Sequence, residues 1–460
     1  MSSGASREVP RVAILVGVFA CGYALIGVFR HWHFGSSAFD LGIFDQVIWH
    51  LSRLEAPASS IRGVSNIFGD HFHPIIVAFV PLYWIAPAPE TLIVAQSLLL
   101  AASIAPVFAY LRDRLPPRPA LTLCVAHGLF WGMQQAAVFD VHEVAFAPLF
   151  IATAILAADR RRWPLFWAAA AGLSLVKEDL IPVLAFIGLY LFARGERRQG
   201  TILVCSSLVA FFLVVKAAIP ALSDSATFGY EGTYAAALRQ PWTIPMTLVT
   251  PPVKLRTVLL WLMPFAFLPL RSPLCVLLVP FALSRFLSSS PNHWGTIFHY
   301  SAPLAPILTM SAGDGLARLV NRLHETRSRA RLTGALAGCC ALLSALLPGN
   351  QPVWDLFSPK HYRTTQVHRT GYEVVKRIPE GASVVAQAAV VPHLSQRDRV
   401  YLLEARAPDA DFLVHSSGLS PWPFSTHAEL SAHFAERRRR GYALVLSANG
   451  WTVLRRSSTP

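Results

Sequence analysis

The sequence predicts an all-α polytopic membrane bundle of about eleven transmembrane helices, followed by a small C-terminal α/β domain. Of its 460 residues, 53% are hydrophobic and only 14% are charged, and the mean hydropathy is +0.44. So few charged side chains cannot cover a water-soluble globule of this size. Apolar runs alternate with short arginine clusters, and the tail changes to strand-like segments. This composition excludes a disordered chain, a coiled coil and a disulfide-stapled secreted domain.

The cysteines and the net charge do not indicate a further class of site. All six cysteines fall inside apolar segments, so neither a metal knuckle nor a disulfide framework is predicted. The formal charge of +14 does not indicate a nucleic-acid partner, because the basic residues are divided among many short clusters and form no single patch. We expect no nucleic-acid binding.

The basic clusters set the predicted topology, because the positive-inside rule places short arginine-rich loops in the cytoplasm. These clusters are Arg7 and Arg11; Arg112, Arg114 and Arg118; Arg160 to Arg162; Arg194, Arg197 and Arg198; Arg271; and Arg318 to Arg331. The apolar runs between them are of roughly 15–22 residues, long enough to cross a hydrocarbon core of about 30 Å, the shorter ones marginally. The predicted spans are 11–30, 91–111, 119–138, 143–158, 163–177, 180–194, 200–221, 255–270, 274–288, 300–317 and 332–348.

An odd number of spans with a cytoplasmic N-terminus places residues 349–460 outside the cytoplasm. The apolar run 74–88 contains four prolines and would reverse the sidedness of the next cluster, so we predict an interfacial or re-entrant segment there. The first span is read as an anchor. The alternative, a cleaved signal peptide, is disfavoured because residues 11–29 exceed a usual h-region and lack an A-x-A site.

The tail is predicted to form a separate unit. Residues 381–386, 398–403, 411–415 and 442–456 have the composition of short strands, and a helix ending in four arginines precedes the last of them. We therefore expect two domains, a transmembrane domain at 1–348 with a large first outer loop at 31–90, and an extracytoplasmic α/β domain at 349–460.

Acidic and histidine residues gather at span ends that this topology places on the outer side. They are Asp40 and Asp45; Asp70, His71 and His73; Asp140, His142 and Glu143; Lys177, Glu178 and Asp179; and His293, His299 and Tyr300. Each ionisable group at membrane depth costs on the order of 2.5–3.5 kcal/mol on insertion scales. Because the topology was set from arginine and lysine alone, their common side predicts a functional site.

Taken singly, most of these residues also have structural explanations. Asp40 suits the N-cap of an amphipathic helix, and Asp70 suits a cap of the segment after it. Lys177 and Glu178 suit an internal ion pair, and His299 with Tyr300 suits an interfacial belt. The hairpin FDVHEV is different, because a turn needs no three ionisable residues, and glycine or asparagine would form it more readily.

The motifs FDLGIFDQVIWHLSR, DHFHPIIVAFVPLYWIAPAPETLIVAQSLLLA, FDVHEVAFAPLF, LVKEDL, HYSAPLAP and VVAQAAVVPHLSQRDRVYLL run through nearly the whole chain. With them the chain resembles the uncharacterised membrane-protein family catalogued as domain of unknown function 2079, which is grouped with the GT-C glycosyltransferases. These are polytopic enzymes that transfer sugars from polyprenyl-phosphate donors outside the membrane, using acidic residues of the first outer loop. The resemblance implies a GT-C-like fold and a partner set of the lipid bilayer and a polyprenyl-phosphate sugar donor.

The resemblance also implies roles for the polar residues. Asp40 lies where the family pattern has its catalytic aspartate and is the expected base, with Asp45 as the second catalytic candidate. Lys177, Glu178, Asp179, His299 and Tyr300 are expected to bind substrate. A divalent ion (Mg²⁺, Mn²⁺ or Zn²⁺) is the candidate cofactor, with ligands drawn from Asp70, His71, His73, Asp140, His142 and Glu143.

Two other functions compete with this hypothesis. A transporter or channel would use Lys177, Glu178 and Asp179 as an ion or proton site, and it predicts polar residues along a path to both membrane faces. The predicted cytoplasmic half has almost none beyond its arginine clusters. A purely structural scaffold leaves the one-sided set of charges unexplained.

Overall fold

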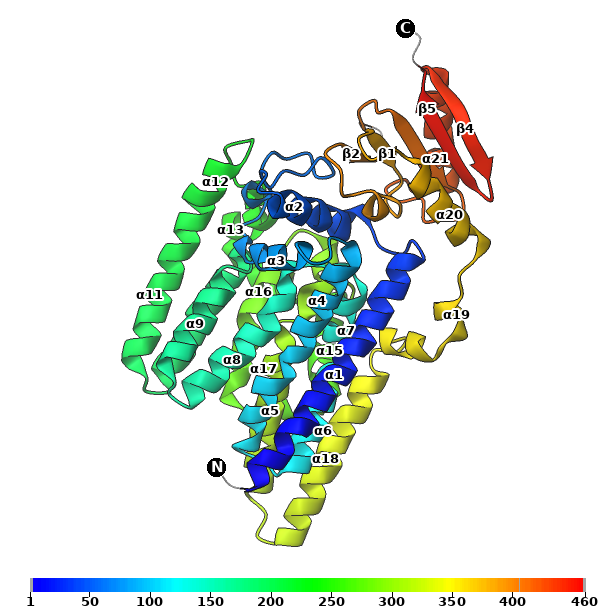
Figure 1. Cartoon of the computed structure of the whole chain (residues 1–460). Helices are drawn as coiled ribbons and strands as arrows, with labels where there is room; N and C mark the ends of the chain where they lie inside the picture. The colour runs from blue at the N-terminus through cyan, green and yellow to red at the C-terminus, as the bar shows by residue number, and fades with distance from the viewer. Residues whose placement is uncertain (1–2, 405, 458–460) are drawn as a thin grey trace.

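The computed structural model describes residues 3–404 and 406–457, and it is a long helical bundle with a small sheet domain at one end (Figure 1). Helices occupy each predicted span in part or in full, and the spans 255–270 and 274–288 also contain the 3-10 segments Met263–Phe265, Leu268–Arg271 and Pro273–Leu278. The α-helices of the predicted spans are α1 (Ser3–Trp32), α4 (Pro89–Ala102), α5 (Ile104–Arg112), α6 (Pro117–Leu129), α7 (Trp131–Val138), α8 (Ala147–Asp159), α9 (Trp163–Ser174), α10 (Ile181–Ala193), α11 (Arg197–Leu213), α12 (Ile219–Leu222), α15 (Val253–Leu262), α16 (Val279–Phe286), α17 (Leu304–Val320) and α18 (Thr326–Leu346).

Prolines mark where several of these helices begin. Pro148, Pro164, Pro182 and Pro280 each lie in the first turn of α8, α9, α10 and α16, where the missing N–H has no intrahelical partner to lose. Four helical stretches in the described part of the chain are long and apolar enough to cross a bilayer by length and composition, namely Glu8–Trp32, Pro89–Arg112, Arg197–Leu222 and Thr326–Leu346. The number of eleven crossings stays a prediction.

The run 74–88 does not form a long helix. It contains a 3-10 segment, Pro74–Phe79, and the single turn α3 (Val80–Tyr83). Together with α2 (Ile43–Ser52) it lies across the end of the bundle, transverse to the long helices (Figure 1). The interfacial or re-entrant position of this segment stays a prediction.

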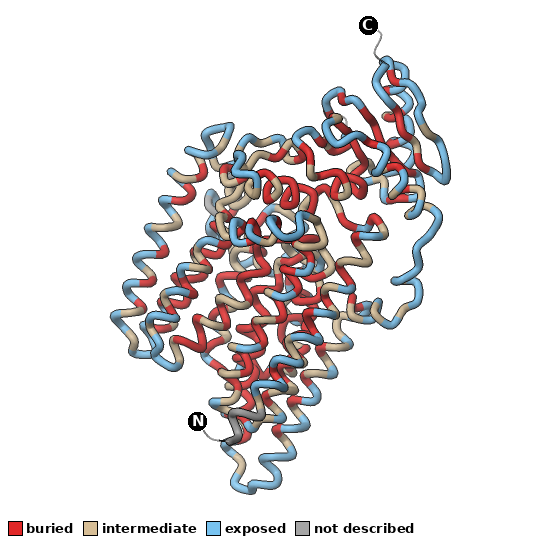
Figure 2. Tube along the Cα trace, viewed as in Figure 1, coloured by how far each residue is buried: buried red, intermediate tan, exposed pale blue. Residues whose placement is uncertain are grey.

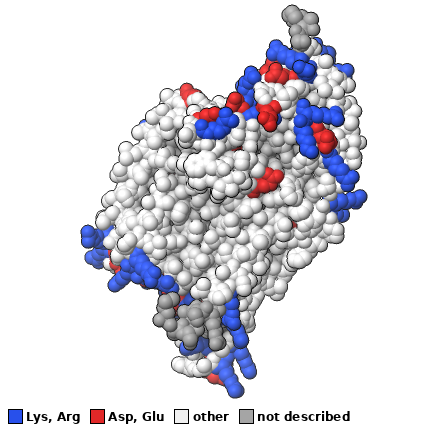
Figure 3. Space-filling model, in the orientation of Figure 1, with Lys and Arg blue, Asp and Glu red and all other residues white. Residues whose placement is uncertain are grey.

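The loops that carry the arginine clusters meet at the opposite end of the bundle. Ion pairs join Arg112 to Glu8, Arg114 to Asp159 and Asp314, Arg160 to Asp113, and Arg161 to Glu196. On the face shown in Figure 3, basic side chains gather at this end and around the sheet domain, and the surface between is largely uncharged. That pattern is expected of a bundle whose middle faces hydrocarbon.

The tail forms a five-stranded mixed sheet of order β2-β1-β3-β5-β4. Its strands are β1 (Val384–Ala386), β2 (Val400–Leu402), β3 (Phe412–Ser416), β4 (Tyr442–Ala448) and β5 (Trp451–Arg456), with helices α20 (Gln366–Arg377) and α21 (His427–Arg439). The predicted single strand 442–456 is wrong in one respect, because it is a hairpin. It turns at Asn449 and Gly450, whose φ values are 49° and 82°.

The sheet domain packs directly on the bundle. Phe34 at the end of α1 lies against the rings of His393, Tyr372 and Trp451, and the amide of Ala38 donates to Ala388 O at 2.8 Å. Buried residues form a cluster that runs from the bundle through α2 into β1 and β3 (Figure 2). The domain therefore has a fixed position above the end of the bundle that carries α2.

Candidate functional site

A cavity of about 1170 Å³ lies at the end of the bundle that carries α2. Almost all of the sequence-predicted site residues line it. They are Asp40, Asp70, His71, His73, Asp140, His142, Glu143, Lys177, Glu178, Asp179, His293, His299 and Tyr300. These residues come from five separate segments and reach one space, and Trp422 of the sheet domain lines it as well.

Asp40 lies in the turn Ala38–Gly42 that leads into α2, with its side chain 24% exposed. The N-cap of α2 is Gly42, so the capping explanation for Asp40 does not hold. Within the described residues, the Asp40 carboxylate accepts no hydrogen bond, and the imidazole of His142 lies close to it, with Nε2 3.9 Å from Oδ2. Burial raises the pKa of Asp40 to about 7, and the carboxylates of Glu143 and Asp140 act in the same direction.

Glu143 is the centre of a buried charge network. Its side chain is 1% exposed, and Oε1 lies 3.1 Å from Lys177 Nζ. Its other oxygen, Oε2, lies 3.0 Å from His142 Nδ1 and 3.6 Å from His73 Nδ1. A buried carboxylate is tolerated only with such partners. The network fixes His142 between Glu143 on one side and Asp40 on the other.

Three further carboxylates are engaged in pairs that hold the cavity walls together. Arg62 donates to both oxygens of Asp70 at 2.8 and 3.0 Å, and Glu178 Oε1 lies 2.6 Å from His71 Nδ1. Asp140 contacts Arg30 Nη1 at 2.5 Å and accepts from the amide of Ser37 at 2.9 Å. These pairs connect the first outer loop to α1 and to the loops after α7 and α9.

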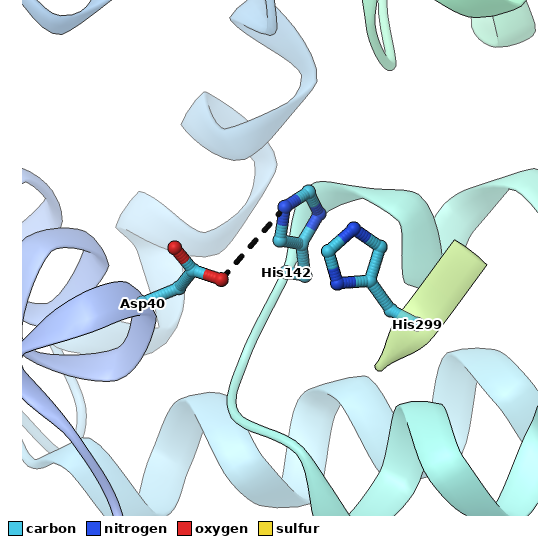
Figure 4. A group of neighbouring side chains, drawn as sticks. All are labelled: Asp40, His142 and His299. Carbon is cyan, nitrogen blue, oxygen red and sulfur yellow. Dashed lines mark ion pairs between the residues drawn. The ribbon is translucent and has the colours of Figure 1, made fainter. Parts of the chain in front are cut away.

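The segment around His299 forms the opposite wall. The His299 and His142 rings stack with centroids 3.6 Å apart (Figure 4). Tyr300 lies beside His299, with ring centroids 4.4 Å apart. The loop before His299 is fastened by Arg285, which donates to His293 O, Gly295 O and Ser301 Oγ at 2.6–2.7 Å. Arg285 thus has a positioning role for the histidine wall.

Asp45 lies apart from this cavity. It is fully buried in α2, and its carboxylate accepts hydrogen bonds from Tyr83, from Ser395 at 2.6 Å and from Gln396 at 3.1 Å. Two of these partners belong to the sheet domain. The contacts give Asp45 the role of fastening the sheet domain to α2, so we do not retain it as a catalytic candidate.

Several cavity residues were missed by the sequence reasoning. Arg30, Arg62, Arg239 and Arg285 all line the cavity, and Tyr230 stacks on His71 at 4.3 Å. The arginines among them could have been predicted from the sequence. Single arginines outside the cytoplasmic clusters do not follow the positive-inside pattern, which indicates a functional or structural role. Arg239 forms no ion pair with the described residues.

A smaller cavity of about 220 Å³ lies at the arginine-rich end, lined by Tyr110, Asp159, Arg161 and Tyr190 among others. It shares no lining residue with the large one. A continuous polar path between the two ends, which a transporter or channel would need, therefore receives no support from these cavities.

The comparisons with known proteins agree on the fold. The family model described as "Predicted membrane protein (DUF2079)" matches residues 30–452. ArnT from Cupriavidus metallidurans bound to undecaprenyl phosphate is similar in structure with a TM-score of 0.60 at 13% identity, covering 98% of both chains. The apo state of ArnT gives a TM-score of 0.57 at 13% identity with the same coverage. No curated protein sequence matches the chain. The chain thus has a fold similar to that of ArnT.

Proposed function

The chain belongs to the DUF2079 family of predicted membrane proteins, and we propose from that premise and from the cavity that it is a glycosyltransferase. In this proposal it takes a sugar from a polyprenyl-phosphate carrier and transfers it to an acceptor outside the cytoplasm. The observation that carries the proposal is the cavity itself. It combines the carboxylate of Asp40, which accepts no hydrogen bond from the described residues, with cationic side chains and an apolar wall.

The proposed reaction is an inverting transfer. The acceptor hydroxyl attacks the anomeric carbon, the bond from that carbon to the phosphate oxygen breaks, and the hydroxyl proton passes to Asp40. A base works best when its pKa lies near the working pH, and the raised pKa of Asp40, about 7, meets that requirement. The polyprenyl phosphate leaves with the electron pair of the broken bond.

The departing phosphate needs positive charge near it. Arg239 is the cavity arginine best suited to this role, because in the described part of the chain it has no carboxylate partner and, unlike Arg285, no hydrogen bonds that hold its guanidinium. Arg30, Arg62 and Lys177 are each held by a carboxylate. We therefore place the phosphate near Arg239, and the substrate-binding roles of Lys177, Glu178, Asp179, His299 and Tyr300 stay proposals for the sugar and the acceptor.

An apolar wall gives the lipid part of the donor a route. Phe211 and Val215 line the cavity, and their neighbours Val209, Phe212 and Leu213 are 59–61% exposed on the outside of the bundle. A polyprenyl chain lying along α11 would thus contact apolar side chains from the bilayer to the cavity.

The test is donor turnover by the full chain in proteoliposomes. Undecaprenyl-phosphate hexoses with a radiolabelled sugar serve as donors, cell-envelope extract supplies acceptors, and loss of label from the lipid fraction is measured. We expect turnover with wild type and little with Asp40→Asn. Binding of undecaprenyl phosphate is measured in parallel by native mass spectrometry. A chain that neither binds this lipid nor turns over any of the donors would contradict the proposal.

A further inference from the structure

Three potential metal-binding side chains converge in the cavity from three separate segments. They are Asp40 before α2, His142 in the loop after α7, and His299 in the short 3-10 turn His299–Ser301. One ligand atom of each lies within 4.8 Å of the others. Figure 4 shows the Asp40 carboxylate directed at the His142 ring, with the His299 ring alongside.

The surroundings of His142 suit coordination through Nε2. Nδ1 accepts a long hydrogen bond from the amide of Val144 at 3.4 Å and lies 3.0 Å from Glu143 Oε2. With an ion on Nε2, the ring proton is on Nδ1 and faces this buried carboxylate. Histidine ligands of metals commonly donate their second N–H to a carboxylate in this way.

The gap between His142 and Asp40 is too long for a hydrogen bond and suits a shared ion. Nε2 lies 3.9 Å from Asp40 Oδ2. A hydrogen bond requires about 3.2 Å or less, whereas two metal–ligand bonds of about 2.0–2.2 Å span such a distance. An imidazole lone pair and a carboxylate oxygen facing each other also gain from a cation between them.

His299 supplies an independent indication. The residue is 4% exposed, and its Nδ1 is buried without a hydrogen-bond partner among the described residues. Buried polar atoms in native proteins rarely lack a partner, and an ion that binds at the site is one of the recognised explanations for such an atom. This nitrogen belongs to the wall that stacks on His142.

We propose that Asp40, His142 and His299 bind one divalent transition-metal ion, with Zn²⁺ the best match to two imidazoles and one carboxylate. This ligand set replaces the one predicted from the sequence. Of those six residues, Asp70, His71, Asp140 and Glu143 are engaged in ion pairs, and His73 lies against Glu143.

The inference rests on the proposed function and extends it, because an ion at this place adds positive charge to the cavity in which the phosphate departs. Glu143 is a positioning residue here, since it touches the ion only through His142.

The test is direct metal binding by the full chain in detergent, with Co²⁺ as the optical probe and Zn²⁺ as competitor. We expect one Co²⁺ per chain, displaced by Zn²⁺. His299→Gln, His142→Gln and Asp40→Asn should abolish this binding or weaken it strongly, and Glu143→Gln should weaken it about 10–100-fold. Size-exclusion chromatography and undecaprenyl-phosphate binding check that each variant is folded.

Two control variants locate the ion. His293→Gln changes a histidine of the same cavity outside the trio, and it should leave Co²⁺ binding unchanged. His50→Gln changes the other described group that could hold an ion, His50 with Glu55 and Asp398, and it should also bind normally. Loss of Co²⁺ in His50→Gln with retention in His299→Gln would overturn the inference, as would the absence of any binding.

The metal site and the proposed transfer activity can be refuted independently of each other. A chain that turns over donor after complete metal removal, and that binds no Co²⁺, overturns the metal site and leaves the proposed function standing. A chain that binds one ion through the trio, and that neither binds undecaprenyl phosphate nor turns over any donor, supports the site and contradicts the function.

Discussion

Replacement by asparagine should abolish most sugar transfer at Asp40 and preserve it at Asp45, five residues further along the chain. Asp40→Asn should lower sugar transfer by about 10²–10⁴-fold, because the amide keeps the shape of the carboxylate and cannot accept the proton. At about 1.36 kcal/mol per decade, this is a loss of roughly 3–5 kcal/mol of transition-state stabilisation. Asp45→Asn should keep transfer within a few-fold of wild type, because Asp45 lies apart from the cavity.

The structure also predicts the cost of each change in folding stability. Asp40 accepts no hydrogen bond from the described residues, so Asn there should change the free energy of unfolding by no more than about 0.5 kcal/mol. For Asp45, Tyr83 and Gln396 both donate to Oδ1, which Asn retains. The new amide faces Ser395 Oγ, whose hydroxyl still has Pro392 O as its acceptor at 2.9 Å. Asp45→Asn should therefore also fold.

The assay compares donor turnover and thermal unfolding for wild type and both variants in the same proteoliposome preparation. Wild-type turnover in Asp40→Asn would refute the assignment of the base. Equal losses in both variants, with normal unfolding, would show that the substitutions act through α2 as a whole and would refute the separation of roles drawn here.

The remaining predictions concern stability and topology. Burial raises the pKa of Asp45 to about 6, although the hydrogen bonds from its partners act in the opposite direction. The contribution of Asp45 to stability is therefore greatest below about pH 4 and falls as the pH rises through 6. Asp45→Asn should flatten that part of the curve of unfolding temperature against pH. Lys177→Met leaves Glu143 buried without its cation and should cost about 3–5 kcal/mol, and adding Glu143→Gln should restore most of it; thermal unfolding without any recovery would contradict the ion-pair argument. A cysteine at Ser417 should react with a membrane-impermeant reagent in intact cells, and protection there would reverse the predicted sidedness.

The features that could be predicted from the sequence are those that depend on consecutive residues. Each apolar span and each polar motif occupies consecutive residues, so the helices of the bundle and most of the cavity lining were readable. The strand hairpin also had a local signal, because Asn449 and Gly450 are the residue pair that a tight turn of this kind prefers. This residue pair predicts a two-residue turn between two strands, where a single strand over 442–456 was expected.

The ion pairs and hydrogen bonds between side chains could not be predicted from the sequence, because they join residues far apart in the chain. Arg30 meets Asp140 across 110 positions, and Asp45 meets Ser395 across 350. The separation of Asp45 from the cavity was not predictable either, because it depends on the hydrogen bonds that Asp45 accepts from Ser395 and Gln396 in the sheet domain.

The position of α11 has a consequence for how substrate supply is measured. Phe211 and Val215 reach the cavity from a helix whose adjacent side chains lie on the outside of the bundle. Under the proposed function, the donor arrives by lateral diffusion within one leaflet and never passes through bulk water. The relevant concentration is then the mole fraction of donor among the surrounding lipids, so adding inert lipid at constant total donor should slow the reaction by surface dilution.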